Sequence, residues 1–485
     1  MILAKAFEKF ADGSPVCVMV RGSLEYALPE EFVDQLFERT AQRQYTRALL
    51  FSDIVDLMSG VVCQVFPSVN AAYQKQHERF SVGRRAVYDK INLVEPRVVR
   101  ELVRSMAQRL EPVVKKLRKK AGFESLLPSW RVRILDGNHL AASEHRIAEL
   151  RDIAAGPLPG HALVAFDPDA RLITDMFPCE DGHAQERSLH LAVLDAMQTD
   201  EVWIADRNFC TTLFFFQTAA NHAYFVIRQH ATNVRWIPVG KRRKIGRTET
   251  GVVYQQRVDL LDDWGGRLSA RRITVRLDQP TEDGDVEIQI LTNLPNRVRA
   301  RAIADAYRGR WKLEGAFGEL AAALHCEIAS LGYPPAALFA FGVGLLAYNI
   351  LSVTRTAIAA AHGPAILEEI SAYYVADEIR GMMRGMSVAI PGAAWRRQFG
   401  GLKAPQMANL LLALARRVNL ACFRKHRRGP KKPRLKRTKY KRQTHVSTAR
   451  ILADSRGKTA TAIASYFSTK LSRMRSKMSV ERLAL

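Results

Sequence analysis

The sequence predicts an α/β protein in which helices precede and follow a strand-rich middle. Apolar residues recur at helical spacing over 45–65 and 96–117, with no strand-like alternation in competition. Short β-type segments bounded by turn residues dominate 130–294. Helical spacing returns from 297 to about 420. We therefore expect a helical N-terminal region, a mixed core and C-terminal helices.

The first β-type segments have a defined order. Residues 132–135 form a short hydrophobic strand that ends at an Asp-Gly pair. Residues 162–166 and 172–177 flank the turn sequence Asp-Pro-Asp-Ala, which predicts a hairpin. An amphipathic helix is expected over 188–197, and a buried strand follows at 202–205. The expected order is strand, hairpin, helix, strand.

The strand pattern continues beyond the next expected strand, at 224–228. Three further segments, at 252–258, 272–277 and 286–291, favour strands and are separated by turn-rich or basic stretches. No helical spacing interrupts them. Residues 229–294 are therefore expected to form an all-β insertion.

Length and charge limit the class of protein. The 485 residues suggest two to four structural units. A composition of 47% hydrophobic and 25% charged residues excludes a wholly disordered or fibrous chain. The 73 basic and 48 acidic residues leave a net charge of +25, so the molecule repels itself unless a polyanion is present. Nucleic acid is the expected partner.

The basic residues are concentrated near the C-terminus. Residues 424–442 contain twelve Lys or Arg and no acidic residue, with Gly and Pro positions that break a helix. We expect this arm to contact DNA phosphates without reading sequence, since each neutralised phosphate releases a counterion. A solvated tail is the alternative. The residues assigned to DNA binding here are Arg427, Arg428, Lys431 and Lys432.

These patterns predict five parts of the chain. The expected parts are a helical N-terminal domain that binds DNA (1–125), the first part of the core (126–228), the β insertion (229–294), the rest of the core with further helices (295–420), and a basic arm with a terminal helix (421–485).

Several other classes of site and location are not expected. The six cysteines have no CxxC pair and no Cys/His spacing that closes a zinc site, so free thiols are expected. Residues 1–13 carry charges that a secretory signal lacks. The uncharged apolar run 336–351 is shorter than the ~20 residues that span a bilayer, so a buried helix is expected. A cytoplasmic protein without a membrane partner is predicted.

Three carboxylates stand out by position. Asp136 and Asp206 each follow a short hydrophobic strand, and strand ends project side chains into a crevice. Glu314 lies in the later helical region, with Tyr307 and Arg310 seven and four residues before it, which predicts one shared helix face. Each also has a purely structural interpretation: a strand-to-turn residue for Asp136, an N-cap for Asp206, and a pair with Arg310 for Glu314.

A converging carboxylate trio implies a divalent cation. Clustered carboxylates repel one another unless a cation neutralises them, and Mg²⁺ or Mn²⁺ prefers oxygen ligands. Two such ions activate an attacking oxygen and stabilise a leaving oxygen in phosphoryl transfer. In a strongly basic protein this trio indicates a nuclease or a strand-transfer enzyme.

Three segments resemble the catalytic blocks of DDE transposases of the insertion-sequence-4 family. They are 135–139 (LDGNH), 204–209 (IADRNF) and 307–314 (YRGRWKLE). The family signature is Tyr, two residues, Arg, three residues, Glu, six residues, Lys. This chain matches the Tyr, Arg and Glu but has Ala321 at the lysine position. Residues 81–90 are also similar to the family's N-terminal region, so the resemblance covers about 40–420.

The resemblance implies a fold and a reaction. The fold is an RNase H-like catalytic core with a β insertion before the catalytic Glu. Asp136, Asp206 and Glu314 would be the catalytic residues and the ligands of Mg²⁺ or Mn²⁺, and Tyr307 and Arg310 would contact phosphates near the transposon end.

The implied activity is cut-and-paste DNA transposition of an insertion sequence. Its partners would be double-stranded DNA, as inverted-repeat ends and target, and a second copy in a homodimeric synaptic complex. The implied location is the nucleoid in the bacterial cytoplasm. Two alternatives are a hydrolytic nuclease on the same fold and an inactive DNA-binding derivative, which Ala321 keeps open.

Overall fold

A computed structural model describes most of the chain: residues 3–46, 48–140, 159–182, 184–281, 284–310, 313, 315, 317–318 and 323–426. Met1–Lys425 form one compact unit and His426–Leu485 a second. The account below concerns the first unit. Some of the predicted residues lie outside the described ranges: Glu314, Ala321, Arg427, Arg428, Lys431 and Lys432.

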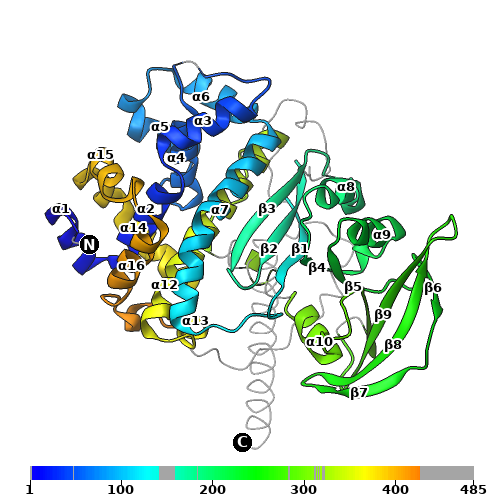
Figure 1. Ribbon diagram of the computed structural model, residues 1–485. Coiled ribbons are helices and arrows are strands. Elements are labelled where there is room, and N and C mark those ends of the chain that lie inside the picture. Colours follow the sequence, from blue (N-terminus) through cyan, green and yellow to red (C-terminus); the bar gives the residue numbers. More distant parts are fainter. Residues whose placement is uncertain are drawn as a thin grey trace, which may run out of the picture. The chain divides into compact units, whose positions relative to one another are not determined.

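The N-terminal part of the unit is helical, as expected (Figure 1). The helix predicted over 96–117 is confirmed, whereas that over 45–65 begins only at Phe51 and ends at Val62. Before it, Glu95 accepts the backbone N–H of Gln42 and Arg43, each at 2.7 Å, in a bend of the chain. The helices are α1 (Lys5–Gly13), α2 (Pro15–Ala27), α3 (Glu30–Thr40), α4 (Phe51–Val62), α5 (Val69–Gln76), α6 (Arg84–Asn92) and α7 (Pro96–Ala121).

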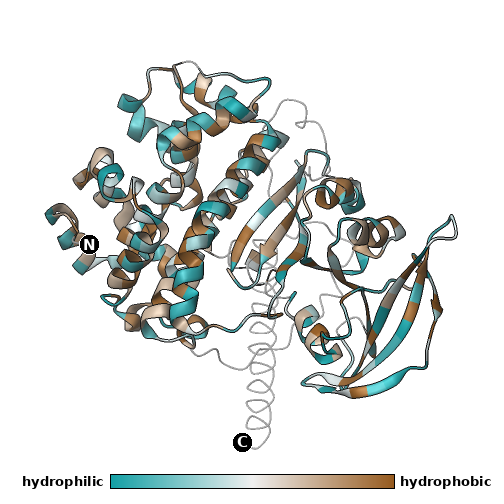
Figure 2. Ribbon diagram, in the orientation of Figure 1, coloured by the Kyte–Doolittle hydropathy of each residue, from teal (hydrophilic) through white to brown (hydrophobic). Residues whose placement is uncertain are grey.

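Helix α7 has clear start and stop signals. Proline occupies its first turn, where the missing N–H has no acceptor to lose. The helix ends at Gly122, whose φ of 70° is left-handed and suits glycine. Hydrophilic and hydrophobic residues alternate around it (Figure 2), and its apolar side packs on α12 (Pro334–His362) and on strand β3 (Leu172–Cys179).

Helix α12 is the buried helix expected from the apolar run 336–351. It is long and apolar enough to cross a membrane, yet 89% of its most apolar window is buried inside the protein. Its neighbours are α2, α4, α7 and α16 (Ala404–Ala415). Because these helices cover it, α12 is a core helix, and a membrane span is not supported. The other helices of this region are α13 (Ile366–Glu369), α14 (Ala372–Ala389) and α15 (Gly392–Trp395).

A large mixed sheet lies beside the helices. Its order is β3-β2-β1-β4-β5-β10-β9-β8-β6, and β7 pairs with β8. Strands β1, β4 and β5 are parallel, and the remaining pairs are antiparallel. The other strands are β1 (Arg131–His139), β2 (His161–Asp167), β4 (Glu201–Ala205), β5 (Tyr224–Arg228), β6 (Arg235–Pro238), β7 (Arg243–Thr248), β8 (Gly251–Leu261), β9 (Arg267–Leu277) and β10 (Glu287–Thr292).

The predicted strands are confirmed, and the hairpin forms as expected. Asp167 closes the β2–β3 turn by accepting the backbone N–H of Asp169 at 2.9 Å and of Ala170 at 2.8 Å. Strands β6 and β7 were not predicted, because they are short and, in β7, largely exposed and basic. The predicted helix 188–197 is shorter: a 3₁₀ turn η3 (Glu186–Leu189) leads into α8 (His190–Leu194).

The strands between 229 and 294 continue the central sheet. Strand β10 pairs antiparallel with β5, with Ile290 opposite Arg228. The long hairpin β8–β9 extends the same sheet. These strands are therefore joined to the parallel strands by backbone hydrogen bonds.

The prediction of one nearly continuous helix from 297 through 324 was wrong. Helix α10 (Ala300–Arg308) ends before Gly309 and Arg310, which form a turn. Gly309 permits this bend, since a Cβ there would lie 2.9 Å from the carbonyl oxygen of Ala306. Tyr307 and Arg310 therefore do not share the face of one continuous helix.

Candidate active site

Asp136 and Asp206 lie at the same level on adjacent parallel strands. In the β1–β4 register Ile134 is opposite Ile204, and each aspartate comes two residues later. Adjacent strands are about 4.8 Å apart, so the two carboxylates are within reach of one cation. The prediction that each aspartate follows a strand end is right for Asp206, which comes directly after β4, and wrong for Asp136, because β1 continues to His139 and Asp136 pairs with Val164 of β2.

The sheet separates two hydrophobic clusters at this point. Ile134 and Ile204 belong to the cluster that includes Tyr307 of α10. Leu135 and Ala205 belong to the opposite cluster with α9 (Thr212–Ala220). Because strand side chains alternate, Asp136 projects on the same side as Ile134. Its carboxylate therefore faces α10.

Arg310 contacts Asp136 directly. Its Nη1 donates to Asp136 Oδ2 at 2.9 Å, and the side chains are 15% and 21% exposed. This is a charge-assisted hydrogen bond in a mostly buried place. Sequence reasoning placed Arg310 near the carboxylates but proposed a pair with Glu314 or a phosphate; among the described residues it pairs with Asp136.

The carboxylate of Asp206 is held mainly by a backbone N–H group. Its Oδ1 accepts the N–H of Asn208 at 2.8 Å, so it caps the 3₁₀ turn η4 (Arg207–Phe209). Burial raises the pKa of this carboxyl, the Asn208 N–H opposes the rise, and the charge of Glu186 adds to it. The N-cap interpretation was therefore correct for Asp206, but the residue is also a buried acid with an elevated pKa.

Tyr307 faces the same site. Burial raises the pKa of its phenol to about 12, although the positive charges of Arg310 and Arg228 favour the phenolate. The charge of Asp206 also acts on it. Tyr307 is therefore a neutral hydroxyl at physiological pH, next to the acids.

Glu186 is a site residue that sequence reasoning missed. Its Oε2 accepts from Nδ2 of Asn208 at 3.1 Å. Its Oε1 lies against Gly137, where an added Cβ would be 2.1 Å away. The only available signal was an acidic residue just before the predicted helix 188–197, which is common at helix starts.

The donors fit a hard divalent cation. Two carboxylates at one level, one of them with an elevated pKa, are the oxygen ligands that Mg²⁺ and Mn²⁺ prefer. In the part of the chain that the structure describes, no three His, Cys, Asp or Glu side chains are grouped around one point. Glu314, the expected third ligand, is outside that part.

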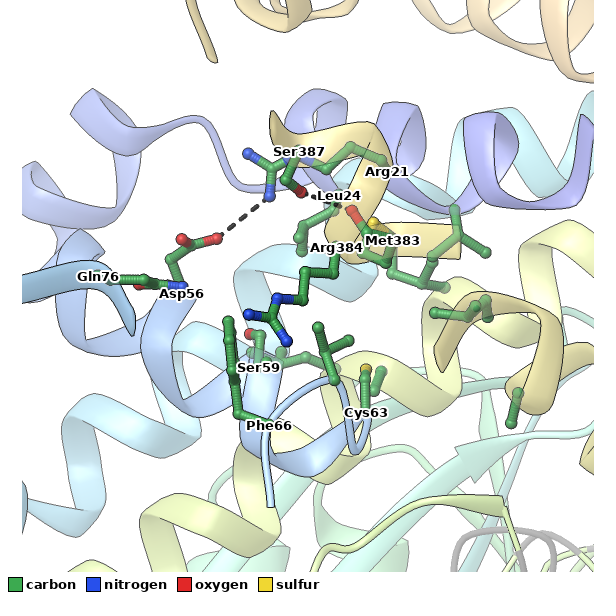
Figure 3. A pocket seen from close by; sticks show the side chains of 18 of the residues that line it. Arg21, Leu24, Asp56, Ser59, Cys63, Phe66, Gln76, Met383, Arg384 and Ser387 are labelled. Carbon is green, nitrogen blue, oxygen red and sulfur yellow. Dashed lines mark hydrogen bonds and ion pairs between the residues drawn. The ribbon is translucent and has the colours of Figure 1, made fainter. Parts of the chain in front are cut away.

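A separate cavity of about 400 Å³ lies among α2, α4 and α14 (Figure 3). Its wall is mostly apolar, and Arg384 lies over the ring of Phe66. At its edge Asp56 forms ion pairs with Arg21 at 3.2 Å and with Arg79 at 2.8 Å. Burial disfavours the Asp56 carboxylate, but the two guanidinium groups lower its pKa overall. None of the predicted site residues that the structure describes lines this cavity.

The cysteines are free, as expected. All six lack a disulfide partner, and burial raises the pKa of Cys17 and Cys63 to about 12. Cys17 and Cys63 are therefore neutral thiols with low nucleophilicity.

The family comparison matches the segment that carries Asp136 and Asp206. Residues 131–350 match the family model described as "Transposase DDE domain". This match supports a DDE transposase. The matched segment begins with β1 and extends into α12, so it contains Asp136, Asp206 and Glu314.

Two other comparisons add little. The chain is similar to a cryo-EM structure of the piggyBac transposase synaptic complex with hairpin DNA, at 9% identity over 92% of each chain and a TM-score of 0.38. A TM-score this low does not establish a shared fold. No match was found among curated proteins.

Proposed function

We propose that the protein is a metal-dependent transposase of the insertion-sequence-4 type, which cleaves DNA at transposon ends and joins the 3′-OH ends to target DNA. The observation that carries the proposal is the pair Asp136 and Asp206, level on adjacent parallel strands within a segment matching a transposase DDE domain. The order β3-β2-β1-β4-β5 supports an RNase H-like core, and β6–β10 an insertion into it.

Asp136, Asp206 and Glu314 would hold Mg²⁺ or Mn²⁺. When bound, the ions supply Lewis-acid stabilisation of the attacking and leaving oxygens. The chain contributes the ligand geometry: β1 and β4 fix the two aspartates at one level. Burial keeps the Asp206 site poorly hydrated, which strengthens its electrostatic interaction with a cation.

Arg310 and Tyr307 are proposed to bind the phosphate next to the cleaved bond. Arg310 is anchored beside Asp136, so its guanidinium is at the place where a phosphate must approach the carboxylates. The neutral phenol of Tyr307 would donate a hydrogen bond to a phosphate oxygen. The net charge of +25 supports double-stranded DNA as partner, and a homodimer would bring two ends together.

Strand transfer is the activity to test. The full chain is incubated with Mg²⁺ and DNA duplexes carrying the sequences that flank its gene, and nicked, cleaved and joined products are separated. Joining of supplied 3′-OH ends to a second duplex supports a transposase. Cleavage without joining indicates the hydrolytic nuclease, and binding without cleavage indicates the inactive derivative that Ala321 keeps open.

The basic arm has its own test. Deletion of 424–442 should weaken DNA binding and flatten the slope of log affinity against log salt concentration, since the lost contacts would be with phosphates. An unchanged slope would remove Arg427, Arg428, Lys431 and Lys432 from the DNA-binding residues.

A further inference from the structure

We propose that Glu186 and Arg187 form a clamp that fixes the loop carrying Asp206, and that Gly137 is glycine because Glu186 occupies the space its side chain would take. Glu186 is a positioning residue in this proposal. The inference rests on the proposed role of Asp206 as a metal ligand.

The orientation of Asp206 depends on Asn208. Asp206 follows the last residue of β4, so no strand hydrogen bonds hold it beyond Ala205. Its carboxylate accepts a hydrogen bond from the N–H of Asn208 at 2.8 Å. Whatever fixes the position of Asn208 therefore fixes the direction of the carboxylate.

Two consecutive residues of η3 hold Asn208 from both ends. Glu186 Oε2 accepts from the side-chain Nδ2 at 3.1 Å. Arg187 Nε donates to the backbone carbonyl oxygen at 3.3 Å. One contact fixes the side chain and the other the peptide, so Asn208 has little freedom to rotate.

Gly137 joins the clamp to the other aspartate. A Cβ at this position would lie 2.1 Å from Glu186 Oε1 and 3.0 Å from its Cδ, whereas the next neighbour, Leu163 Cδ2, is at an ordinary 3.4 Å. The Glu186 carboxylate therefore rests directly on β1, one residue from Asp136. It spans from the strand of one aspartate to the loop of the other.

The charge of Glu186 also reaches the site. It raises the pKa of Asp206, which shows that the two carboxylates are electrostatically coupled across Asn208. The clamp thus has two separable parts: a hydrogen-bond acceptor for Asn208 and a negative charge. We assign the positioning to the acceptor.

Three variants separate these parts. Glu186→Gln keeps an oxygen that accepts from Asn208 and removes the charge, while Glu186→Ala removes both. Glu180→Ala is the matched control, because Glu180 is an exposed acid six residues away and outside the clamp. Asp206→Ala reports whether the proposed metal site exists.

The primary readout is Mn²⁺ binding by the full chain, measured by calorimetry without DNA, and the second is the Mg²⁺ concentration that gives half-maximal cleavage. We expect Glu186→Ala to weaken Mn²⁺ binding and raise half-maximal Mg²⁺ by about tenfold, the lower end of the effect of lost outer contacts. Glu186→Gln and Glu180→Ala should stay within about twofold of wild type. Maximal cleavage at saturating Mg²⁺ should fall less than the metal affinity.

Two outcomes overturn the clamp. One is wild-type Mn²⁺ binding in Glu186→Ala while Asp206→Ala abolishes it, and the other is an equal loss in Glu186→Gln and Glu186→Ala, which would assign the effect to charge. If Asp206→Ala itself leaves Mn²⁺ binding unchanged, the proposed metal site fails instead.

A double-mutant cycle tests the role of Gly137. Gly137→Ala should weaken Mn²⁺ binding in the wild-type background, since the methyl group displaces the Glu186 carboxylate. In the Glu186→Ala background the methyl group has space, so Gly137→Ala should have almost no added effect. Equal losses in both backgrounds would show that Gly137 serves another purpose. Thermal unfolding of each variant confirms that the fold is retained.

Discussion

The two ends of strands β1 and β4 differ in how their charged side chains are paired. At the N-terminal end Arg133 pairs with Asp167 at 2.6 Å and with Glu201 at 3.2 Å, and these side chains are 8%, 13% and 4% exposed. At the C-terminal end Asp136 has Arg310. Within the described ranges, no Lys or Arg forms an ion pair with Asp206.

The difference between the paired carboxylates and Asp206 separates charges that stabilise the fold from a charge that does not. The sheet needs its buried carboxylates neutralised, and an arginine does this for Asp167 and Glu201 at one end and for Asp136 at the other. At the other end burial leaves the pKa of Asp206 elevated, which means that its ionised form is disfavoured. The positive charges of Arg310 and Arg207 offset this rise only in part, and a carboxyl group with a raised pKa is typical of functional sites.

The largest expected effect tests the C-terminal end. Asp206→Asn, Asp136→Ala and Glu314→Ala should each reduce DNA cleavage to background, because each removes a proposed metal ligand. DNA binding should stay within severalfold, since none removes a cation. Cleavage near the wild-type rate in any variant removes that residue from the site.

Asp206→Asn should also leave the free energy of unfolding at pH 7 unchanged or higher. The folded-state pKa of Asp206 is raised, so its contribution to stability is present below the unfolded pKa and declines as pH rises through the folded value. The amide removes that penalty. Urea unfolding at pH 7 measures it, and a clear loss of stability would mean that Asp206 is structural.

The next effect tests the N-terminal end. Arg133→Met leaves Asp167 and Glu201 buried without their partner and should lower the free energy of unfolding by about 3–5 kcal/mol. Arg131→Met, on the same strand but exposed, is the control and should cost less than about 0.5 kcal/mol. Urea unfolding decides it, and similar values for both variants would contradict the contrast between the two ends.

A smaller, pH-dependent effect concerns the layer behind the Asp206 loop. His190 is 3% exposed and stacks on Phe209, and burial lowers its pKa from 6.5 to about 4. When the pKa of a histidine is lower in the folded state than in the unfolded state, its contribution to stability is fully present at pH values above the unfolded-state pKa. That contribution declines as pH falls from 6.5 to about 4, by up to about 3 kcal/mol.

His190→Phe should remove this dependence, because phenylalanine fills the same aromatic space without titrating. Unfolding free energies at pH 7 and pH 5 give the comparison. If the variant loses as much stability between the two pH values as wild type, the dependence arises from other groups.

The smallest effect concerns the departure from the family signature. Ala321→Lys should restore a phosphate contact and improve cleavage by up to about 1 kcal/mol, the size of one exposed charge contact. If Lys312 already replaces it, Lys312→Ala should lower cleavage and Ala321→Lys should be neutral. Cleavage rates of the two variants distinguish these cases, and no change in either contradicts both.

Local pattern predicted most of this fold, because each strand of the parallel centre is a short buried run and each aspartate directly follows one. The sequence could not show that Glu186 contacts Asn208, since that contact depends on how η3 meets η4 in space. It also missed the end of α10, because Gly309 alone is a weak signal inside a helical pattern. Arg310 was placed near the acids, but its contact with Asp136 spans 174 positions and has no local signature.

The burial of α12 has a consequence for synthesis on the ribosome. Three of its partners, α2, α4 and α7, lie earlier in the chain and are already available when this apolar helix leaves the exit tunnel. Domains fold from the N-terminus during translation, so these helices can cover it at once. We expect this order to keep a segment of membrane-like hydropathy away from the targeting and insertion machinery that recognises emerging apolar helices. Circular permutants that place α12 first should aggregate or be mistargeted.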